Sequence, residues 1–131
     1  MEGDEAPELT VGPITRTDIV RYAGAGGDFN PIHHDEPFAV SAGMPSTFAM
    51  GMLQGGILAQ RLARWVGPEN VTNLTIRFTG QVWPGDVLSL SGRVASVTDE
   101  GPLRIAALEL AVTRQTGDRV IAATATARIA R

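Results

Sequence analysis

The pattern of this sequence changes once, at Gly67-Pro68, and that change restricts the possible folds. Before it, from about residue 47 to residue 66, apolar side chains recur every three or four positions, which predicts a long and largely buried helix. After it, β-branched residues alternate with polar ones, which predicts strands. The apolar positions of the predicted helix are Phe48, Met52, Ile57, Leu58, Leu62 and Trp65.

Four strands are predicted after the helix, separated by short turn-forming sequences such as Pro84-Gly85-Asp86. Short links between consecutive strands predict an antiparallel meander. A long buried helix followed by such a sheet predicts an α+β fold, in which a strongly curved antiparallel sheet wraps around the central helix. The predicted strands cover residues 74–78, 87–94, 103–112 and 119–129.

The length and composition of the chain predict a single domain over residues 1–131, with any flexibility confined to about residues 1–8. Of the 131 residues, 44% are apolar and 19% are charged, which is typical of a folded globular protein. An open sheet leaves an edge strand exposed, and pairing that edge with a second copy of the chain would cover it. We therefore expect a dimer.

Several classes of function are disfavoured by the composition. The absence of cysteine excludes disulfides, thiolate metal sites and cysteine nucleophiles. A net charge of −3 argues against nucleic-acid binding, which needs a basic face. No apolar run reaches membrane-spanning length, and the acidic N-terminal residues lack the apolar region of a secretory signal. We expect a cytoplasmic protein that binds neither nucleic acid nor membrane.

Two shorter helices are predicted before the long one. Thr15 and Asp18 have the spacing of a capping box, which predicts a helix over residues 16–25, and the glycine-rich residues 24–27 end it. Residues 28–35 combine polar groups with a proline and predict an ordered loop. Residues 36–42 predict one or two further helical turns.

That loop carries the residues best suited to chemistry, Asp28, Asn30 and His33. A carboxylate, an amide and an imidazole within six positions can converge on one small site. The carboxylate can accept a proton or hold a water, and a histidine exchanges protons near neutral pH. The same residues can equally form Asx turns and cap the neighbouring helices, and for a loop taken alone this structural role is the more common one.

A metal site is a weaker interpretation of this loop. His33 and His34, with Asp28 and Asp35, offer ligands, but adjacent histidines generally point apart and the chain has no third histidine. A serine hydrolase would need a Gly-x-Ser-x-Gly elbow, which the sequence lacks. We therefore expect no metal site.

The start of the long helix offers a second functional element at Gly51. Amides in the first turn of a helix lack intrahelical partners, so they can polarise a carbonyl that approaches closely, and glycine has no side chain to obstruct it. Close packing explains this glycine equally well. Gly55 and Gly56 allow the same two interpretations, an apolar channel for a ligand or tight packing of the helix on the sheet.

Three motifs follow one another along the chain: the run from Tyr22 to Asp35 with its Gly-Asp-Phe-Asn-Pro-Ile-His core, Ala49 to Leu53, and Arg77-Phe78-Thr79 followed by Pro84-Gly85-Asp86. Their order and spacing, over about residues 15 to 95, resemble the MaoC-like, or (R)-specific enoyl-CoA hydratase, family. The resemblance implies a hotdog fold. It also implies that Asp28 and His33 are catalytic, that Asn30 positions the water or the His33 ring, and that Gly51 N–H serves the oxyanion. The family pattern usually has histidine where this chain has Met50, which leaves the substrate and the partner open.

The implied activity is that of a hydro-lyase, the reversible hydration of a trans-2-enoyl thioester to a (3R)-3-hydroxyacyl thioester. Coenzyme A or an acyl carrier protein would carry the acyl group, and no metal or redox cofactor is required. One alternative is a hotdog thioesterase, although such enzymes usually place a carboxylate on the long helix, where this chain has Gln54. Another is a subunit that is active only in a heteromer with a second hotdog chain, so both a homodimer and a heterodimer fit.

Overall fold

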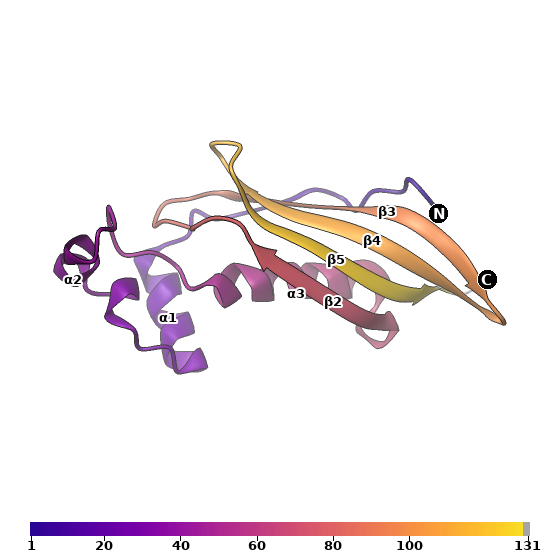
Figure 1. Ribbon diagram of the computed structural model, residues 1–131, viewed down its shortest axis with the longest axis horizontal. Coiled ribbons are helices and arrows are strands. Elements are labelled where there is room, and N and C mark those ends of the chain that lie inside the picture. Colours follow the sequence, from indigo (N-terminus) through magenta and orange to yellow (C-terminus); the bar gives the residue numbers. More distant parts are fainter. Residues whose placement is uncertain (130–131) are drawn as a thin grey trace.

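Five strands form one antiparallel sheet. Figure 1 shows this sheet curving around a single long helix. The computed structural model describes residues 1–129. The long helix, α3, spans Gly51–Val66 and lies along the concave face of the sheet. Its buried side faces the sheet and includes Leu58 and Leu62, which join the main hydrophobic core. The predicted α+β architecture, a curved antiparallel sheet around a central helix, is confirmed.

The order of the strands differs from the predicted meander. Only β3, β4 and β5 follow one another across the sheet, whereas β2 pairs with β5 and not with β3. The link over residues 79–87 is too long for a tight hairpin, and it carries the chain from one side of the sheet to the other. In the order β1-β3-β4-β5-β2, the strands span β1 Leu9–Val11, β3 Leu88–Glu100, β4 Leu103–Arg114, β5 Arg119–Ile129 and β2 Val71–Phe78.

The N-terminal residues also run along the sheet. Strand β1 pairs with β3, and before it Gly3 N–H donates to Val94 O while Ala6 N–H donates to Gly92 O, both over 2.9 Å. Strand β1 was not predicted because three residues are too short to establish an alternating pattern.

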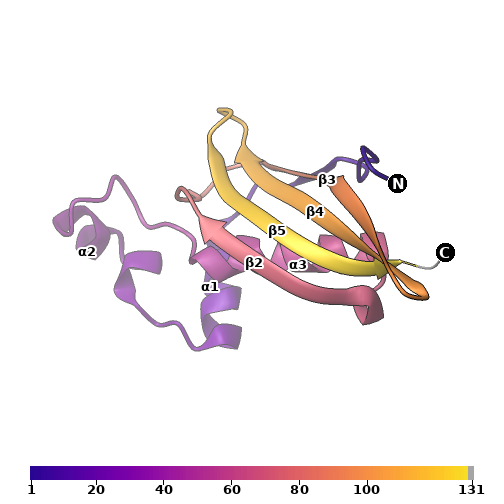
Figure 2. The same ribbon diagram turned by 45° about the vertical axis from the view of Figure 1, so that its right-hand side comes forward.

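Two short helices lie at the end of the molecule where α3 begins. Figure 2 shows them to one side of the sheet. Helix α1 spans Arg16–Gly26 and has the predicted capping box: Asp18 N–H donates to Thr15 Oγ1 over 3.0 Å, and Thr15 N–H donates to Asp18 Oδ2 over 2.8 Å. The hydrogen bond from Thr15 N–H to the carboxylate is the main cause of a lowered pKa for Asp18. Helix α2 spans Glu36–Ser41 and begins after Asp35, whose side chain accepts from Phe38 N–H. Short 3₁₀ turns cover Pro31–His33 and Pro68–Asn70.

Helix α3 begins four residues later than predicted. Residues 47–50 are not helical, and Met50 is extended at φ −70° and ψ 144°, because the backbone here bonds to another segment: Ala49 N–H donates to Val82 O over 2.8 Å. Gly51 is therefore the first helical residue. Among residues 1–129, no helix is long and apolar enough to cross a membrane.

Candidate active site

The loop between α1 and α2 is held by its own side chains. Asp28 Oδ1 accepts a hydrogen bond from Asn30 N–H over 3.3 Å, and Asn30 Oδ1 accepts one from Ile32 N–H over 3.2 Å. Asn30 is thus the N-cap of the 3₁₀ turn that carries His33. The capping interpretation of these residues is correct, but it leaves the second carboxylate oxygen of Asp28 free for another role.

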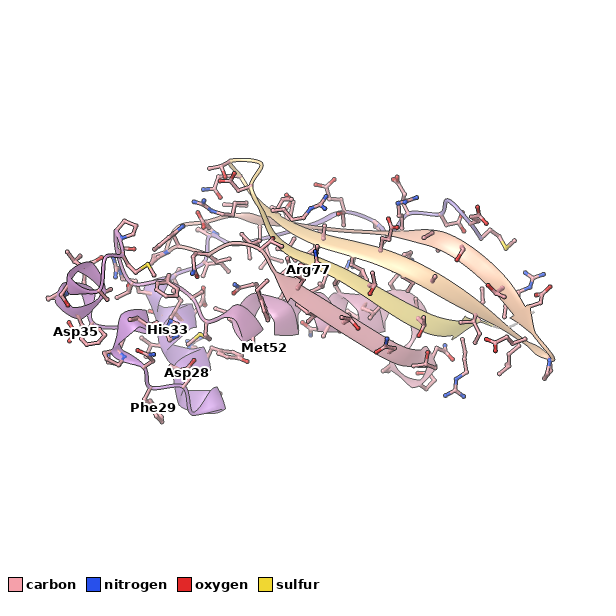
Figure 3. All side chains as sticks on the ribbon, viewed as in Figure 1. Asp28, Phe29, His33, Asp35, Met52 and Arg77 are labelled. Carbon is pink, nitrogen blue, oxygen red and sulfur yellow. The ribbon has the colours of Figure 1, made fainter. Side chains whose placement is uncertain are left out.

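That second oxygen faces His33. Asp28 Oδ2 lies 3.4 Å from His33 Nε2, and Figure 3 shows the two side chains on neighbouring parts of the loop. The His33 side chain is 7% exposed, whereas that of Asp28 is 44% exposed. The imidazole is therefore buried behind a carboxylate that reaches solvent, and the two predicted catalytic residues are brought together.

The other ring nitrogen of His33 fixes the orientation of the imidazole. Nδ1 lies 2.7 Å from the backbone oxygen of Phe48, and the two rings pack edge to face with centroids 5.2 Å apart. A carbonyl oxygen only accepts hydrogen bonds, so the proton of the neutral ring is on Nδ1 and the lone pair of Nε2 points towards Asp28. Sequence reasoning did not find this backbone partner, and it had considered Asn30 for holding the ring.

The start of α3 lies just after Phe48 in the sequence. Three residues later, Gly51 N–H is the first amide of the helix, and Met50 before it provides no side-chain cap. Such an amide is available to a ligand, and it lies at the positive end of the helix dipole. The Cα of Gly51 is covered on one side by the ring of Phe78, at the end of β2: a Cβ at residue 51 would lie 2.9 Å from Phe78 Cε1.

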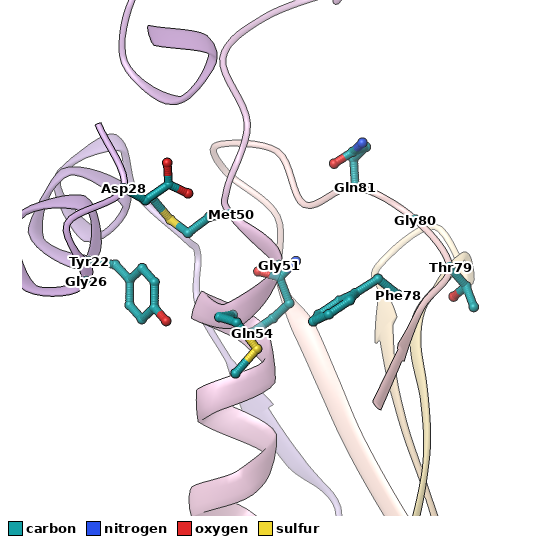
Figure 4. A pocket seen from close by; sticks show the side chains of 11 residues that line it. Tyr22, Gly26, Asp28, Met50, Gly51, Gln54, Phe78, Thr79, Gly80 and Gln81 are labelled. Carbon is teal, nitrogen blue, oxygen red and sulfur yellow. The ribbon is translucent and has the colours of Figure 1, made fainter. Parts of the chain in front are cut away.

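A cavity of about 710 Å³ connects these elements. Asp28 and Gly51 both line it, together with Tyr22 from α1, Phe78 from β2 and Gln81 from the link after β2, as Figure 4 shows. The cavity therefore offers a carboxylate backed by an imidazole, the first amide of α3, and a mixture of aromatic and polar walls. Among residues 1–129, no three His, Asp or Glu side chains are grouped as metal ligands would be.

Gln54 is a lining residue that sequence reasoning did not assign to the pocket. Its side chain is buried at 2% exposure, and its Oε1 has no hydrogen-bond partner among the described residues. Leaving a buried polar group unpaired costs about 1–3 kcal/mol. The signal was present in the sequence, because Gln54 lies four residues before Leu58 and eight before Leu62, on the buried side of the predicted helix.

A buried ion pair supports the wall behind His33. Asp86 is 3% exposed and binds Arg114 through Oδ2···Nε at 2.7 Å and Oδ1···Nη2 at 3.1 Å; it also accepts from Trp83 N–H and Gln115. Burial alone would raise the pKa of Asp86, but these hydrogen bonds outweigh it and lower the pKa. The Trp83 ring packs edge to face on Phe48, whose carbonyl orients His33.

Comparison with known proteins identifies the family that shares this fold. The family model described as a MaoC like domain matches residues 3–102. The chain belongs to the MaoC-like domain family. Among solved structures, this MaoC-like chain is similar to the (R)-hydratase PhaJ1 from Pseudomonas aeruginosa, with a TM-score of 0.84 and 28% identity, covering 99% of this chain and 81% of that one. A structure of the ChsH1-ChsH2 complex from Mycobacterium tuberculosis also matches, with a TM-score of 0.84, 25% identity, and 100% and 98% of the two chains covered.

Curated relatives agree at the level of the family. The MaoC-like chain is 31% identical over 116 residues to 3-hydroxybutyryl-CoA dehydratase from Methylorubrum extorquens, covering 87% of this chain and 71% of that protein. It is 33% identical over 90 residues to 3-hydroxyacyl-thioester dehydratase Y from Mycobacterium tuberculosis, covering 66% of this chain and 31% of that protein. The chain thus spans less than a third of the length of dehydratase Y.

Proposed function

We propose that the chain is a hydro-lyase that adds water reversibly to a trans-2-enoyl thioester and forms a (3R)-3-hydroxyacyl thioester. The observation that carries this proposal is the pairing of Asp28 with His33 at a pocket that also contains the free amide of Gly51. The (R) configuration is supported by likeness to the (R)-specific enoyl-CoA hydratase of Rhodospirillum rubrum, which is 30% identical over 89 residues.

In this mechanism, Asp28 and His33 position and activate the water. With its proton on Nδ1, the His33 ring presents a lone pair at Nε2, and an ionised Asp28 presents a second acceptor 3.4 Å away. A water that donates one hydrogen to each of them turns its own lone pairs towards the substrate. Asn30 fixes the turn that carries His33 and thereby holds the geometry of the pair.

Gly51 N–H would donate a hydrogen bond to the thioester oxygen and so stabilise the negative charge that develops there. The thioester oxygen binds this amide, the water oxygen forms a bond with C3, and electron density moves through C2 to the thioester oxygen as an enolate. One water proton passes to the Asp28/His33 pair, which returns a proton to C2. Hydrogen and hydroxyl are thus added across the C2–C3 bond, and the reverse sequence is dehydration.

We also infer that the chain acts as a dimer through strand β2. This strand is the last in the sheet order, so its outer edge has no neighbouring strand among residues 1–129. Phe78, the last residue of β2, is 47% exposed, and Met52 on α3 is 50% exposed; both also line the pocket, so a partner at this edge would cover apolar surface beside it. A second copy is the simplest partner. A different hotdog chain is the alternative, supported by likeness to the ChsH1-ChsH2 complex.

The decisive experiment supplies purified protein with enoyl-CoA thioesters of several chain lengths and follows loss of the conjugated absorbance. The Asp28→Asn and His33→Ala variants should lose activity by at least about 100-fold. His34→Ala is the matched control, because His34 is the exposed neighbour of His33 and should retain activity. Equal rates in wild type and in both the Asp28→Asn and His33→Ala variants would refute the assignment.

Two further measurements separate the rival functions. Release of free thiol from a saturated acyl-CoA would indicate a thioesterase, which we do not expect because Gln54 stands where such an enzyme would need a carboxylate. Light scattering should give the mass of a dimer. A monomer without activity, activated only by a second hotdog chain, would indicate the heteromeric alternative.

A further inference from the structure

Gln54 is an anomaly in the core-facing side of α3. The buried positions of this helix include Gln54, Leu58 and Leu62, which are separated by four residues and therefore form one stripe. Two of the three are leucines at 0% and 1% exposure, and the third is an amide at 2%. Leu58 and Leu62 belong to the hydrophobic core, whereas Gln54, the first residue of the stripe, lines the pocket.

The amide of Gln54 is not satisfied by the protein. Its Oε1 is buried without a partner among the described residues, and the side chain lines the same pocket as Asp28 and Gly51, as Figure 4 shows. Buried polar groups in proteins are nearly always hydrogen-bonded, and an apolar side chain of the same size would fill this position without that penalty. A group that enters the pocket is therefore the natural partner of this amide.

We propose that Gln54 determines the substrate specificity of this pocket by binding a hydroxyl group on the acyl chain of the thioester. The inference rests on the proposed function and goes beyond it, because it names the chemistry of the chain that is bound. A hydroxyl both donates and accepts, so it pairs with the Oε1 and with the Nε2 of an amide. The phenol of Tyr22 lines the same pocket and provides a second polar contact.

The position of Gln54 limits where that hydroxyl lies. Gln54 follows Gly51 by three residues, which is about 4.5 Å along the helix axis. With the thioester oxygen on Gly51 N–H, the acyl chain has only a few bonds in which to reach the amide. The hydroxyl therefore belongs on C4 or C5, close to the reacting carbons.

The test compares trans-hex-2-enoyl-CoA with its 4-hydroxy and 5-hydroxy forms. Binding is measured by calorimetry in the Asp28→Asn background, where the ligand is not consumed, and kcat/KM is measured in the unsubstituted protein. At least one hydroxylated thioester should bind about tenfold more tightly than the plain one, the size of one good hydrogen bond. Gln54→Met should remove this preference, so that the hydroxylated and plain thioesters bind with similar affinity to the variant.

The matched control is Gln60→Met, because Gln60 lies on the same helix but is exposed. This variant should retain the preference. Equal binding of all three thioesters to the Asp28→Asn protein would overturn the inference, and so would a preference that survives in Gln54→Met. If Gln54→Met fails to fold, equal binding of the three thioesters to the Asp28→Asn protein still overturns the inference, because that background retains Gln54.

Failure of the proposed function gives a different result. A protein that hydrates none of the three thioesters, but binds a hydroxylated one preferentially through Gln54, would refute the hydratase assignment and leave the specificity assignment intact. A protein that hydrates all three thioesters at equal rates, and whose rates are the same in Gln54→Met, would refute the specificity assignment and leave the hydratase assignment intact.

Discussion

The ring of Phe78 packs against Gly51 so closely that it occupies the space a side chain at residue 51 would need. A Cβ there would meet Phe78 Cε1 at 2.9 Å and Cδ1 at 3.0 Å, so something must shift to admit a methyl group. The contact joins the end of β2 to the first turn of α3. It therefore sets where the proposed oxyanion donor lies relative to the sheet.

Gly51→Ala should lower kcat/KM for enoyl-CoA hydration by about 100-fold, because a displacement of the order of 1 Å at a reacting group has that effect. Removing the obstructing ring in Gly51→Ala/Phe78→Ala should recover part of the loss. Gly56→Ala is the control: a Cβ at Gly56 meets nothing within 4 Å, and the change should stabilise the helix by about 0.5–1 kcal/mol without loss of activity. Full activity in Gly51→Ala would contradict the oxyanion role.

The neutral ring of His33 should carry its proton on Nδ1, because Phe48 O lies 2.7 Å from that nitrogen and can only accept. Two-bond ¹H–¹⁵N correlation spectra at neutral pH, with His34→Ala used to assign the signals, distinguish the two tautomers. Signals showing the proton on Nε2 would remove the proposed acceptor for the water.

Asp86→Asn should destabilise the protein by about 3 kcal/mol, because it removes one charge of a buried pair and leaves Arg114, at 18% exposure, with only the exposed Asp118 as an acidic partner. Chemical unfolding at pH 7 measures this loss. Asp118→Asn is matched to it, since Asp118 contacts the same arginine over 3.4 Å but is 70% exposed. This control should change stability by less than about 1 kcal/mol.

The free energy of unfolding should decrease in acid because the carboxyls of Asp18 and Asp86 become protonated. The pKa values of Asp18 and Asp86 are lowered from 3.8, so each carboxyl binds its proton more weakly in the folded chain than in the unfolded one. Their contribution is complete above the unfolded pKa and is lost as pH falls through the lower folded pKa. The free energy of unfolding should therefore fall below about pH 4. The decrease should be smaller in Asp86→Asn; an equally steep decrease in that variant would contradict the assignment.

Gln54→Met should raise the free energy of unfolding of the unliganded protein by about 1 kcal/mol, because it replaces an unpaired buried amide with an apolar chain of similar length. Thermal unfolding without ligand measures the gain. Gln60→Met, at an exposed position, should show none. A loss of stability in Gln54→Met would mean that the amide is already satisfied in the free protein.

Local pattern predicted the elements of this fold better than their pairing. The capping box of Thr15 and Asp18 and the alternation of the strands depend on neighbours in the sequence, and both predictions are confirmed. The pairing of β2 with β5 depends on the path of residues 79–87 across the sheet, which no local pattern records. The extended backbone before Gly51 is likewise set by a distant contact, from Ala49 N–H to Val82 O.

The same distinction applies to the candidate site. Asp28 and His33 were predicted because they lie five positions apart on one turn and resemble a known motif, and the structure brings them to 3.4 Å. The partner that orients the ring is a backbone oxygen, that of Phe48, which carries no signature of residue type. The spacing of Gln54 from Leu58 and Leu62 placed it on the buried side of the helix, but only the structure shows that this side ends in a pocket.

The backbone of Phe48 has a consequence for engineering. The short extended segment from Phe48 to Gly51 supplies both the acceptor that aims His33 and the amide proposed for the thioester oxygen. Insertions or bulky replacements in this segment would disturb both the orientation of His33 and the position of Gly51 N–H. We therefore expect such changes to abolish activity and not to reduce it gradually. Attempts to redirect the enzyme to new acyl chains should begin with Tyr22, Gln54 and Phe78, which reach the pocket from other parts of the fold.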